Sequence, residues 1–292
     1  MQYNRKFDQV FGSEKIDCFY SVALKITTKC CFSCEFCCEK NYEKDSKNND
    51  SDWQDIVKLL INHGTKRFCI TGGEPLLYAD FANIIEEIKN NGGYVSVCTA
   101  SGYHFIDKIK PISKYVDFIR FSMHGERKYH DKITNQKGAY NNLIEAIHLA
   151  QKINLPFSIS SVITNDLIPQ IEQFIQNAIS LNAKKIDFFP VLKSGNGLKY
   201  LKTNDFDLNQ AKKIILKLKN QYQSEIIINY YEYEWPECIL VYRNGDVVID
   251  PVHDEVNYQL TIGNIFKNDC SYIWDTFSKK HSNNQYLEHL KK

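Results

Sequence analysis

Short apolar runs alternate with helical patterns along most of this 292-residue chain. In Trp53–His63 the apolar residues recur three and four positions apart, which is the spacing of an amphipathic helix. Runs of strand length are expected at Val22–Thr27, Arg67–Thr71, Tyr94–Thr99, Phe118–Ser122, Phe157–Ile163 and Lys185–Phe189. Helices are expected at Trp53–His63, Phe81–Asn90, Phe105–Tyr115, Tyr140–Ile153, Ile168–Leu181 and Leu208–Gln221.

The order of these elements predicts the fold class. Strands that alternate with helices form a parallel sheet wrapped by helices. Six such units are too few for a closed eight-stranded barrel, so we expect an α/β fold, a partial (β/α)6 TIM-like barrel. Ligands in such folds collect beyond the carboxyl ends of the strands.

The rhythm changes after about residue 224. Ile239–Arg243 and Asp246–Asp250 flank Asn244-Gly245, a strong hairpin signal. A turn at Gly263-Asn264-Ile265 and a helix from Tyr272 follow. We therefore expect two domains, a barrel core at 1–224 and a small β-rich C-terminal appendage at 225–292.

Charge and composition narrow the location and the partners. The net charge is +1, which gives no support for a nucleic-acid or anionic-membrane partner. No run of 18 apolar residues occurs, and Met1–Gly12 has no apolar signal core. We expect a cytoplasmic protein, in which the ten cysteines serve as ligands, core residues or catalysts rather than disulfides.

Five of the ten cysteines lie between Cys30 and Cys38, just after the first expected strand. Cys30, Cys34 and Cys37 have the spacing C-x3-C-x2-C. Three thiolates suit three irons of a cubane and leave its fourth iron open to a small molecule with an amine and a carboxylate. Alternatives are silent core cysteines, or a zinc site built from Cys31, Cys34 and either Cys37 or Cys38 with a distant ligand. A non-catalytic iron–sulfur or zinc protein that senses or scaffolds is the corresponding alternative function.

This spacing, with Phe36 as the aromatic residue before the third cysteine, resembles the signature of the radical S-adenosylmethionine (SAM) superfamily. The resemblance extends over residues 20–192. It implies that Cys30, Cys34 and Cys37 hold one [4Fe–4S] cluster and that Phe36 belongs to the cofactor site. Cys31 and Cys38 are extra, and we interpret them as packing residues or a reactive pair.

Other segments match the same superfamily at the ends of the expected strands. Gly72-Gly73-Glu74 resembles its GGE motif, in which Glu74 would accept the methionyl ammonium of SAM. By the same resemblance Thr99, Ser101 and Ser122 would line the SAM pocket. His130-Asp131-Lys132-Ile133-Thr134 matches a His-Asp-x-x-Arg segment except at Thr134, where an arginine is expected.

The resemblance also implies the chemistry. A reduced cluster would cleave SAM to methionine and a 5′-deoxyadenosyl radical, which abstracts hydrogen from the substrate, while the protein supplies position and shielding. The electron would come from an external donor such as flavodoxin or ferredoxin.

Residues 238–274 resemble, more weakly, the C-terminal extension of the SPASM/Twitch branch. A second cysteine expected near Asp250 is absent, so the extension keeps the scaffold and has lost the ligands of auxiliary clusters. Without an internal electron acceptor, we expect epimerisation, rearrangement or coupling rather than net oxidation. The matching residues are Cys238, Gly245-Asp246-Val247, Gly263-Asn264-Ile265 and Trp274, and the next cysteine is Cys270.

The substrate class remains open between a peptide or protein side chain and a small metabolite. Only about twenty residues precede the first expected strand, too few for a leader-recognition domain, which favours a small molecule slightly, or a peptide supplied by a separate protein. Candidate residues at the mouth of the site are Tyr103, His124, His130, Lys193 and Asp250.

Overall fold

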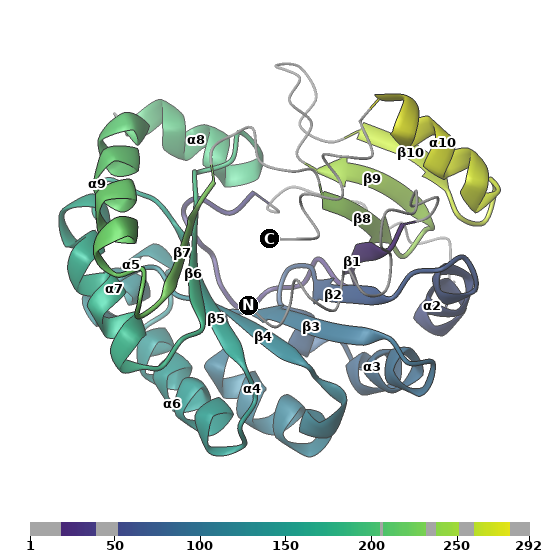
Figure 1. Ribbon diagram of the computed structural model, residues 1–292, viewed down its shortest axis with the longest axis horizontal. Helices are drawn as coiled ribbons and strands as arrows, with labels where there is room; N and C mark the ends of the chain where they lie inside the picture. Colours follow the sequence, from purple (N-terminus) through teal and green to yellow (C-terminus); the bar gives the residue numbers. More distant parts are fainter. Residues whose placement is uncertain (1–18, 39–51, 205–206, 232–237, 251–259, 281–292) are drawn as a thin grey trace.

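A computed structural model describes the protein at residues 19–38, 52–204, 207–231, 238–250 and 260–280. The strands of these residues form one sheet in the order β10-β9-β8-β1-β2-β3-β4-β5-β6-β7. Neighbours from β1 to β7 are parallel, and β8-β9-β10 are antiparallel. The fold is therefore the predicted α/β partial barrel with antiparallel C-terminal strands (Figure 1).

The parallel strands are β1 (Ser21–Lys25), β2 (Arg67–Thr71), β3 (Tyr94–Thr99), β4 (Phe118–Ser122), β5 (Phe157–Val162), β6 (Lys185–Phe189) and β7 (Ile227–Tyr230). The C-terminal strands are β8 (Cys238–Tyr242), β9 (Asp246–Asp250) and β10 (Leu260–Asn264). The α-helices are α2 (Trp53–Asn62), α3 (Phe81–Asn90), α4 (Gly102–Ile109), α5 (Arg127–Ile133), α6 (Ala139–Lys152), α7 (Ile171–Ser180), α8 (Gly195–Thr203), α9 (Leu208–Gln221) and α10 (Cys270–Lys280).

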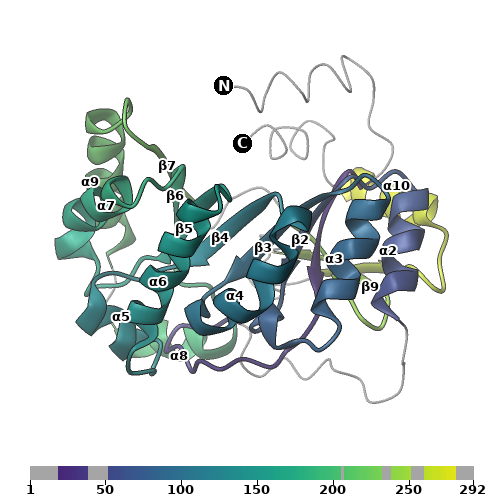
Figure 2. The same cartoon turned by 90° about the horizontal axis from the view of Figure 1, so that it is seen from below.

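Side chains alternate between the two faces of the parallel sheet. In β2, Phe68 and Ile70 are buried, whereas Arg67, Cys69 and Thr71 between them are partly exposed. The buried set packs beneath the helices, which cover the outer face of the curved sheet (Figures 1 and 2). The inner face is therefore the more polar one, and it leads up to the strand ends where a ligand is expected.

Local signals explain where individual helices begin and end. Asp52 caps α2 by accepting a hydrogen bond from the Gln54 amide at 3.1 Å. The helix predicted over Phe105–Tyr115 instead begins at Gly102 and changes after Ile109 into the 3-10 helix η2 (Lys110–Tyr115). Pro111 accounts for this change, because proline donates no amide hydrogen bond and disrupts an α-helix interior.

The structure contains one strand and two helices of the barrel that the hydrophobic pattern did not predict. β7 is only four residues long and its Ile227 is exposed, so it lacked a clear apolar run. α5 has seven residues, and α8 starts Gly-Asn-Gly, which is a poor helix start by composition. β7 also lies beyond residue 224, so the sheet continues past the expected domain boundary.

The C-terminal strands extend the barrel sheet at its first strand. β8 pairs parallel with β1, and the predicted Asn244-Gly245 turn joins β8 to β9, with Gly245 at φ +84°. α10 packs on the core through Trp274, whose ring lies 5.0 Å from that of Phe19. The side chains of Cys238 and Asp250 lie outside the described part of the structure; their backbones face each other across β8 and β9.

No helix in the described residues is both long and apolar enough to span a bilayer.

Candidate functional site

The cysteine loop follows β1 at the carboxyl end of the sheet, as predicted. Cys30 is exposed, Cys34 and Cys37 are half-buried, and none of the three is in a disulfide. A turn closed by the Cys37 amide on the Cys34 carbonyl, at 3.2 Å, brings the second and third cysteines onto one bend. The loop therefore presents three reduced thiols above the sheet.

Two glycines hold the entrance of this loop. A β-carbon on Gly72 would lie 2.3 Å from the Thr27 carbonyl oxygen, and one on Gly73 would lie 2.4 Å from that of Lys29. The Gly73 amide donates to the Thr27 carbonyl at 2.7 Å, and the Glu74 amide donates to that of Lys29 at 2.8 Å. The two glycines thus let the backbone after β2 pack directly against the backbone of the cysteine loop, which no larger residue allows.

The far end of the loop is held by elements that the sequence reasoning missed. The Asn196 amide donates to the Cys37 carbonyl at 2.8 Å, and its side chain donates to that of Cys34 at 3.1 Å. Ser194 donates to the Cys38 carbonyl at 3.0 Å. Ser194 and Asn196 lie at the start of α8, which follows β6. This segment therefore fixes the far end of the cysteine loop.

The middle of the loop is anchored on the end of α5. The Ser33 amide donates to the Thr134 carbonyl and the Glu35 amide to that of Ile133, both at 3.1 Å. The Thr134 hydroxyl is buried and donates to the His130 carbonyl at 2.7 Å. Thr134 therefore stands where the superfamily pattern has an arginine, but it supports the loop with its backbone.

Glu74 is the most heavily bonded predicted residue. One carboxylate oxygen accepts from the Thr99 hydroxyl at 2.8 Å and from the Leu76 amide at 3.2 Å. The other accepts from the amides of Ala100 and Ser101 at 3.0 and 3.1 Å. Burial raises the pKa of Glu74 to about 7, although these hydrogen bonds act in the opposite direction. The carboxylate thus ties the end of β2 to the end of β3.

The remaining predicted residues surround this carboxylate unequally. Thr99 and Ser101 lie against it, and the Ser101 hydroxyl caps α4 at the His104 amide, 3.4 Å away. Ser122 ends β4, one strand further along the sheet. Phe36 is buried, with its ring 4.8 Å from that of His124 at the same end. The sheet therefore gathers the predicted residues from β2, β3 and β4 beside the cysteine loop.

Two of the candidate mouth residues are wrong. His130 is fully buried, and its Nδ1 accepts from the His124 amide at 3.1 Å. His124 is also buried and accepts from the Val162 amide through Nδ1 at 3.3 Å. Burial lowers the pKa of both imidazoles, to about 4 for His130. These histidines are neutral packing residues, whereas Tyr103 is exposed.

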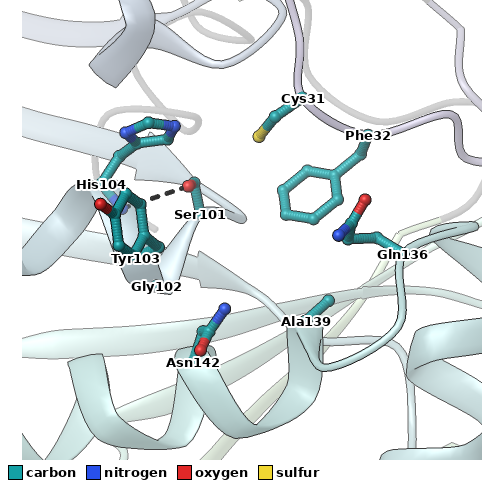
Figure 3. A pocket seen from close by; sticks show the side chains of 9 residues that line it. All are labelled: Cys31, Phe32, Ser101, Gly102, Tyr103, His104, Gln136, Ala139 and Asn142. Carbon is teal, nitrogen blue, oxygen red and sulfur yellow. Dashed lines mark hydrogen bonds between the residues drawn. The ribbon is translucent and has the colours of Figure 1, made fainter.

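A pocket of about 210 Å³ adjoins the site on the side of α4 and α6. Cys31 and Phe32 face Ser101 and His104 across it (Figure 3). Neither Glu74 nor Ser122 lines it, so the pocket is next to the predicted SAM site rather than identical with it. Its lining is completed by Gly102, Tyr103, Gln136, Ala139 and Asn142.

The arrangement of the donors bears on the kind of metal centre. In the described residues, no three Cys, His, Asp or Glu side chains converge closely enough to hold one metal ion. A structural zinc site needs four ligands converging at about 2.0–2.3 Å. A cubane instead takes one thiolate on each of three separate irons, so the two kinds of centre need different ligand sets.

Comparison with known proteins identifies the family of this chain. The family model described as Radical SAM superfamily matches residues 24–178, more than half of the chain. PqqA peptide cyclase of Bradyrhizobium diazoefficiens is 20% identical over 72% of this chain and 57% of its own length. A GTP 3′,8-cyclase of Vibrio atlanticus is 25% identical over 61% of this chain and 55% of its own. The chain thus spans a little over half the length of these curated relatives.

Solved structures match nearly the whole chain in fold. Streptococcus suis SuiB bound to precursor peptide SuiA superposes with a TM-score of 0.71 and 15% identity, covering 94% of this chain and 68% of that one. Native anSMEcpe with bound AdoMet and the Kp18Cys peptide gives a TM-score of 0.68 and 15% identity, covering 92% and 82%. The chain belongs to the radical SAM superfamily, whose enzymes use a [4Fe–4S] cluster and S-adenosylmethionine.

Proposed function

We propose that this radical SAM enzyme binds its cluster through Cys30, Cys34 and Cys37. The observation that carries the proposal is the three-sided backbone anchoring of a loop whose three cysteines are reduced, at the carboxyl end of the sheet. Such anchoring fixes the thiols before any cofactor arrives, and preorganisation of this kind lowers the cost of binding. When bound, the reduced cluster supplies the electron that cleaves SAM to methionine and a 5′-deoxyadenosyl radical.

SAM is proposed to lie over the ends of β2, β3 and β4. Its methionyl group would lie beside the Gly72–Glu74 turn, whose glycines pack directly against the backbone of the cysteine loop. Glu74 lies nearby, where the ammonium of SAM would favour its ionised form, and it also positions Thr99 and Ser101. Phe36 and Ser122 would complete the pocket. The neighbouring buried histidines exclude water from this end of the barrel.

A peptide or protein side chain is the substrate class that we propose. Its support is that SuiB and anSMEcpe, both described with bound peptides, match this chain over more than nine-tenths of its length. A small metabolite is the second candidate, supported by the relatives named GTP 3′,8-cyclase. We propose that residues 238–274 correspond to a degenerate SPASM/Twitch-like extension, and that an external flavodoxin or ferredoxin supplies electrons.

Deuterium transfer tests the substrate class. Peptides encoded beside the gene, perdeuterated, would be incubated with the reduced enzyme and SAM, with GTP in a parallel reaction. Because the radical takes hydrogen from the substrate, deuterium in 5′-deoxyadenosine together with a changed peptide mass supports the peptide. Modification of GTP alone would contradict it.

A further inference from the structure

The inner wall of the barrel carries a charged cluster that the cofactor site does not use. Arg67 and Cys69 of β2, Arg120 of β4 and Asp187 of β6 occupy the strand positions that alternate with the helix-packed residues. Arg67, Cys69 and Arg120 are partly exposed, which fits an inner face open to a ligand. The wall therefore joins side chains from several strands.

Asp187 is the buried centre of this cluster. Its Oδ2 lies 3.2 Å from Nζ of Lys185 and 3.7 Å from Nε of Arg120. Its Oδ1 accepts from the side-chain Nδ2 of Asn229 at 2.8 Å and from the Tyr231 hydroxyl at 3.5 Å. A carboxylate that is fully buried in this way requires paired charges and donors.

Arg120 is not fully used by this pairing. Its Nε is buried and makes no hydrogen bond with the described residues, and about a third of the side chain is exposed to the inner space. Arg67 and Lys185 are in electrostatic reach of each other, and Lys185 is in reach of Arg120. Two cations, Lys185 and Arg120, thus lie beside the buried Asp187, and Arg67 lies near Lys185.

Two thiols, those of Cys69 and Cys98, lie beside these cations. Sγ of Cys69 lies 3.4 Å from Sγ of Cys98. The hydrogen bond from Cys98, followed by the charges of Arg120 and Arg67, lowers the pKa of Cys69 to about 6. Asp187 faces Lys185 and Arg120, with Arg67 near Lys185, so cations outnumber carboxylates among these described residues, which favours an anionic ligand.

Arg120 and Cys69 lie just below the strand ends that carry the cofactor site, whereas Arg67 and Lys185 are the first residues of β2 and β6. Arg120 precedes Ser122 by two residues on β4, and Cys69 precedes Thr71 by two on β2. Two strand residues span about 7 Å. A group held at Arg120 would therefore lie directly beneath the strand ends, where the proposed SAM site is.

We propose that Arg120, with Arg67 and Lys185, forms a binding site for a carboxylate of the substrate, such as an acidic side chain of a peptide. A guanidinium binds a carboxylate through paired, charge-assisted hydrogen bonds, which also fix its orientation. The inference rests on the proposed function, because it supplies the substrate contact that this function requires. It adds the prediction that the modified substrate carries an acidic group close to the reacting carbon.

Probe binding tests the site on the holoenzyme with SAM. N-acetyl-glutamate N-methylamide, its glutamine counterpart and inorganic phosphate would be compared by saturation-transfer NMR and calorimetry. The glutamate probe should bind and the glutamine probe should not. Arg120→Gln should weaken the glutamate probe about 10- to 100-fold, as loss of a charge-assisted contact does. Arg127→Gln, an exposed cation on α5, should leave binding unchanged.

Three results would overturn the site. They are no binding of the glutamate probe, equal binding of the glutamate and glutamine probes, and an Arg120→Gln variant that binds like the parent. Tighter, Arg120-dependent binding of phosphate would overturn the carboxylate assignment.

A second measurement needs no variant and separates the two proposals. The glutamate probe should slow alkylation of Cys69 in the unmodified holoenzyme, measured by peptide mass spectrometry, while Cys270 on α10 reacts at an unchanged rate. Enzyme that cleaves SAM but gives no protection of Cys69 contradicts the carboxylate site alone. Enzyme that gives protection but never cleaves SAM contradicts the proposed function alone.

Discussion

Some residues of the site act through the groups on their side chains, and others act because they have no side chain. Glu74 accepts four hydrogen bonds from its own chain, so its carboxylate is structural before any ligand binds. Gly72 and Gly73 act by lacking a side chain. The residue types drew attention to all three positions in the sequence, and their predicted place in the SAM pocket stays a prediction.

The raised pKa of Glu74 predicts a pH-dependent stability. Between its ordinary value and about 7, the folded chain holds a proton that the unfolded chain has lost, so the free energy of unfolding falls as pH rises. For a shift of this size the loss is about 3 kcal/mol.

Urea unfolding of the cluster-free protein at pH 5 and pH 8 would measure this. Glu74→Gln does not titrate, and it should be the less stable protein at pH 5, by a margin that narrows at pH 8. A difference between the two proteins that is the same at both pH values would show that Glu74 does not titrate in this range.

The ligand register predicts a contrast between adjacent cysteines. Cys30→Ala, Cys34→Ala and Cys37→Ala should each lose the iron and the visible absorbance of the cluster, because one iron is left without its thiolate. Cys31→Ala and Cys38→Ala are the matched controls and should keep both. Retention in Cys30→Ala with loss in Cys31→Ala would move the register by one residue.

At the scale of elements, the cysteine loop is held by β2, α5 and α8 through backbone hydrogen bonds. Most of these contacts could not be predicted from sequence, because a carbonyl such as that of Thr134 accepts equally well from any residue. The six predicted parallel strands were readable from their apolar runs. β7 and α8 were not, because β7 exposes Ile227 and α8 begins with two glycines in three residues.

The glycine contact between β2 and the loop gives the element-scale prediction. In Gly73→Ala the new methyl group would meet the Lys29 carbonyl at 2.4 Å, so the loop must move. Overpacking of this kind lowers stability by about 1–3 kcal/mol, and the iron content of reconstituted protein should fall with it.

Gly92→Ala is the control for backbone strain. Its φ is +74°, but no atom lies within 4 Å of the added methyl group. It should cost about 1–2 kcal/mol of stability through the left-handed backbone alone and keep its iron. Equal iron in both variants would show that the close approach at Gly73 does not position the ligands.

At the scale of the molecule, the charged contact on the inner face of the barrel could not be predicted from the sequence pattern. Arg120 and Asp187 sit at every-other positions of apolar strands, and this alternation was visible in the sequence. Their contact was not, because it depends on β4 and β6 curving toward each other around β5. Contacts between interior charges of this kind become visible only when the curvature of the sheet is known.

The C-terminal extension predicts the total metal content. The second ligand position near Asp250 has no cysteine, and two cysteines after residue 224 are too few for a cubane. Reconstituted protein should therefore bind about four irons per chain, with matching sulfide. About eight irons would mean that the extension holds a second cluster.

The central claim is that this chain cleaves SAM with a cluster held by the loop at Cys30–Cys37. The most direct measurement is chromatography with mass detection of 5′-deoxyadenosine and methionine, after anaerobic reconstitution with iron and sulfide and reduction by dithionite in the presence of SAM. We expect both products in equal amounts from the parent protein and neither from Cys34→Ala. A parent protein that holds a reducible cluster but forms no more 5′-deoxyadenosine than Cys34→Ala would contradict it.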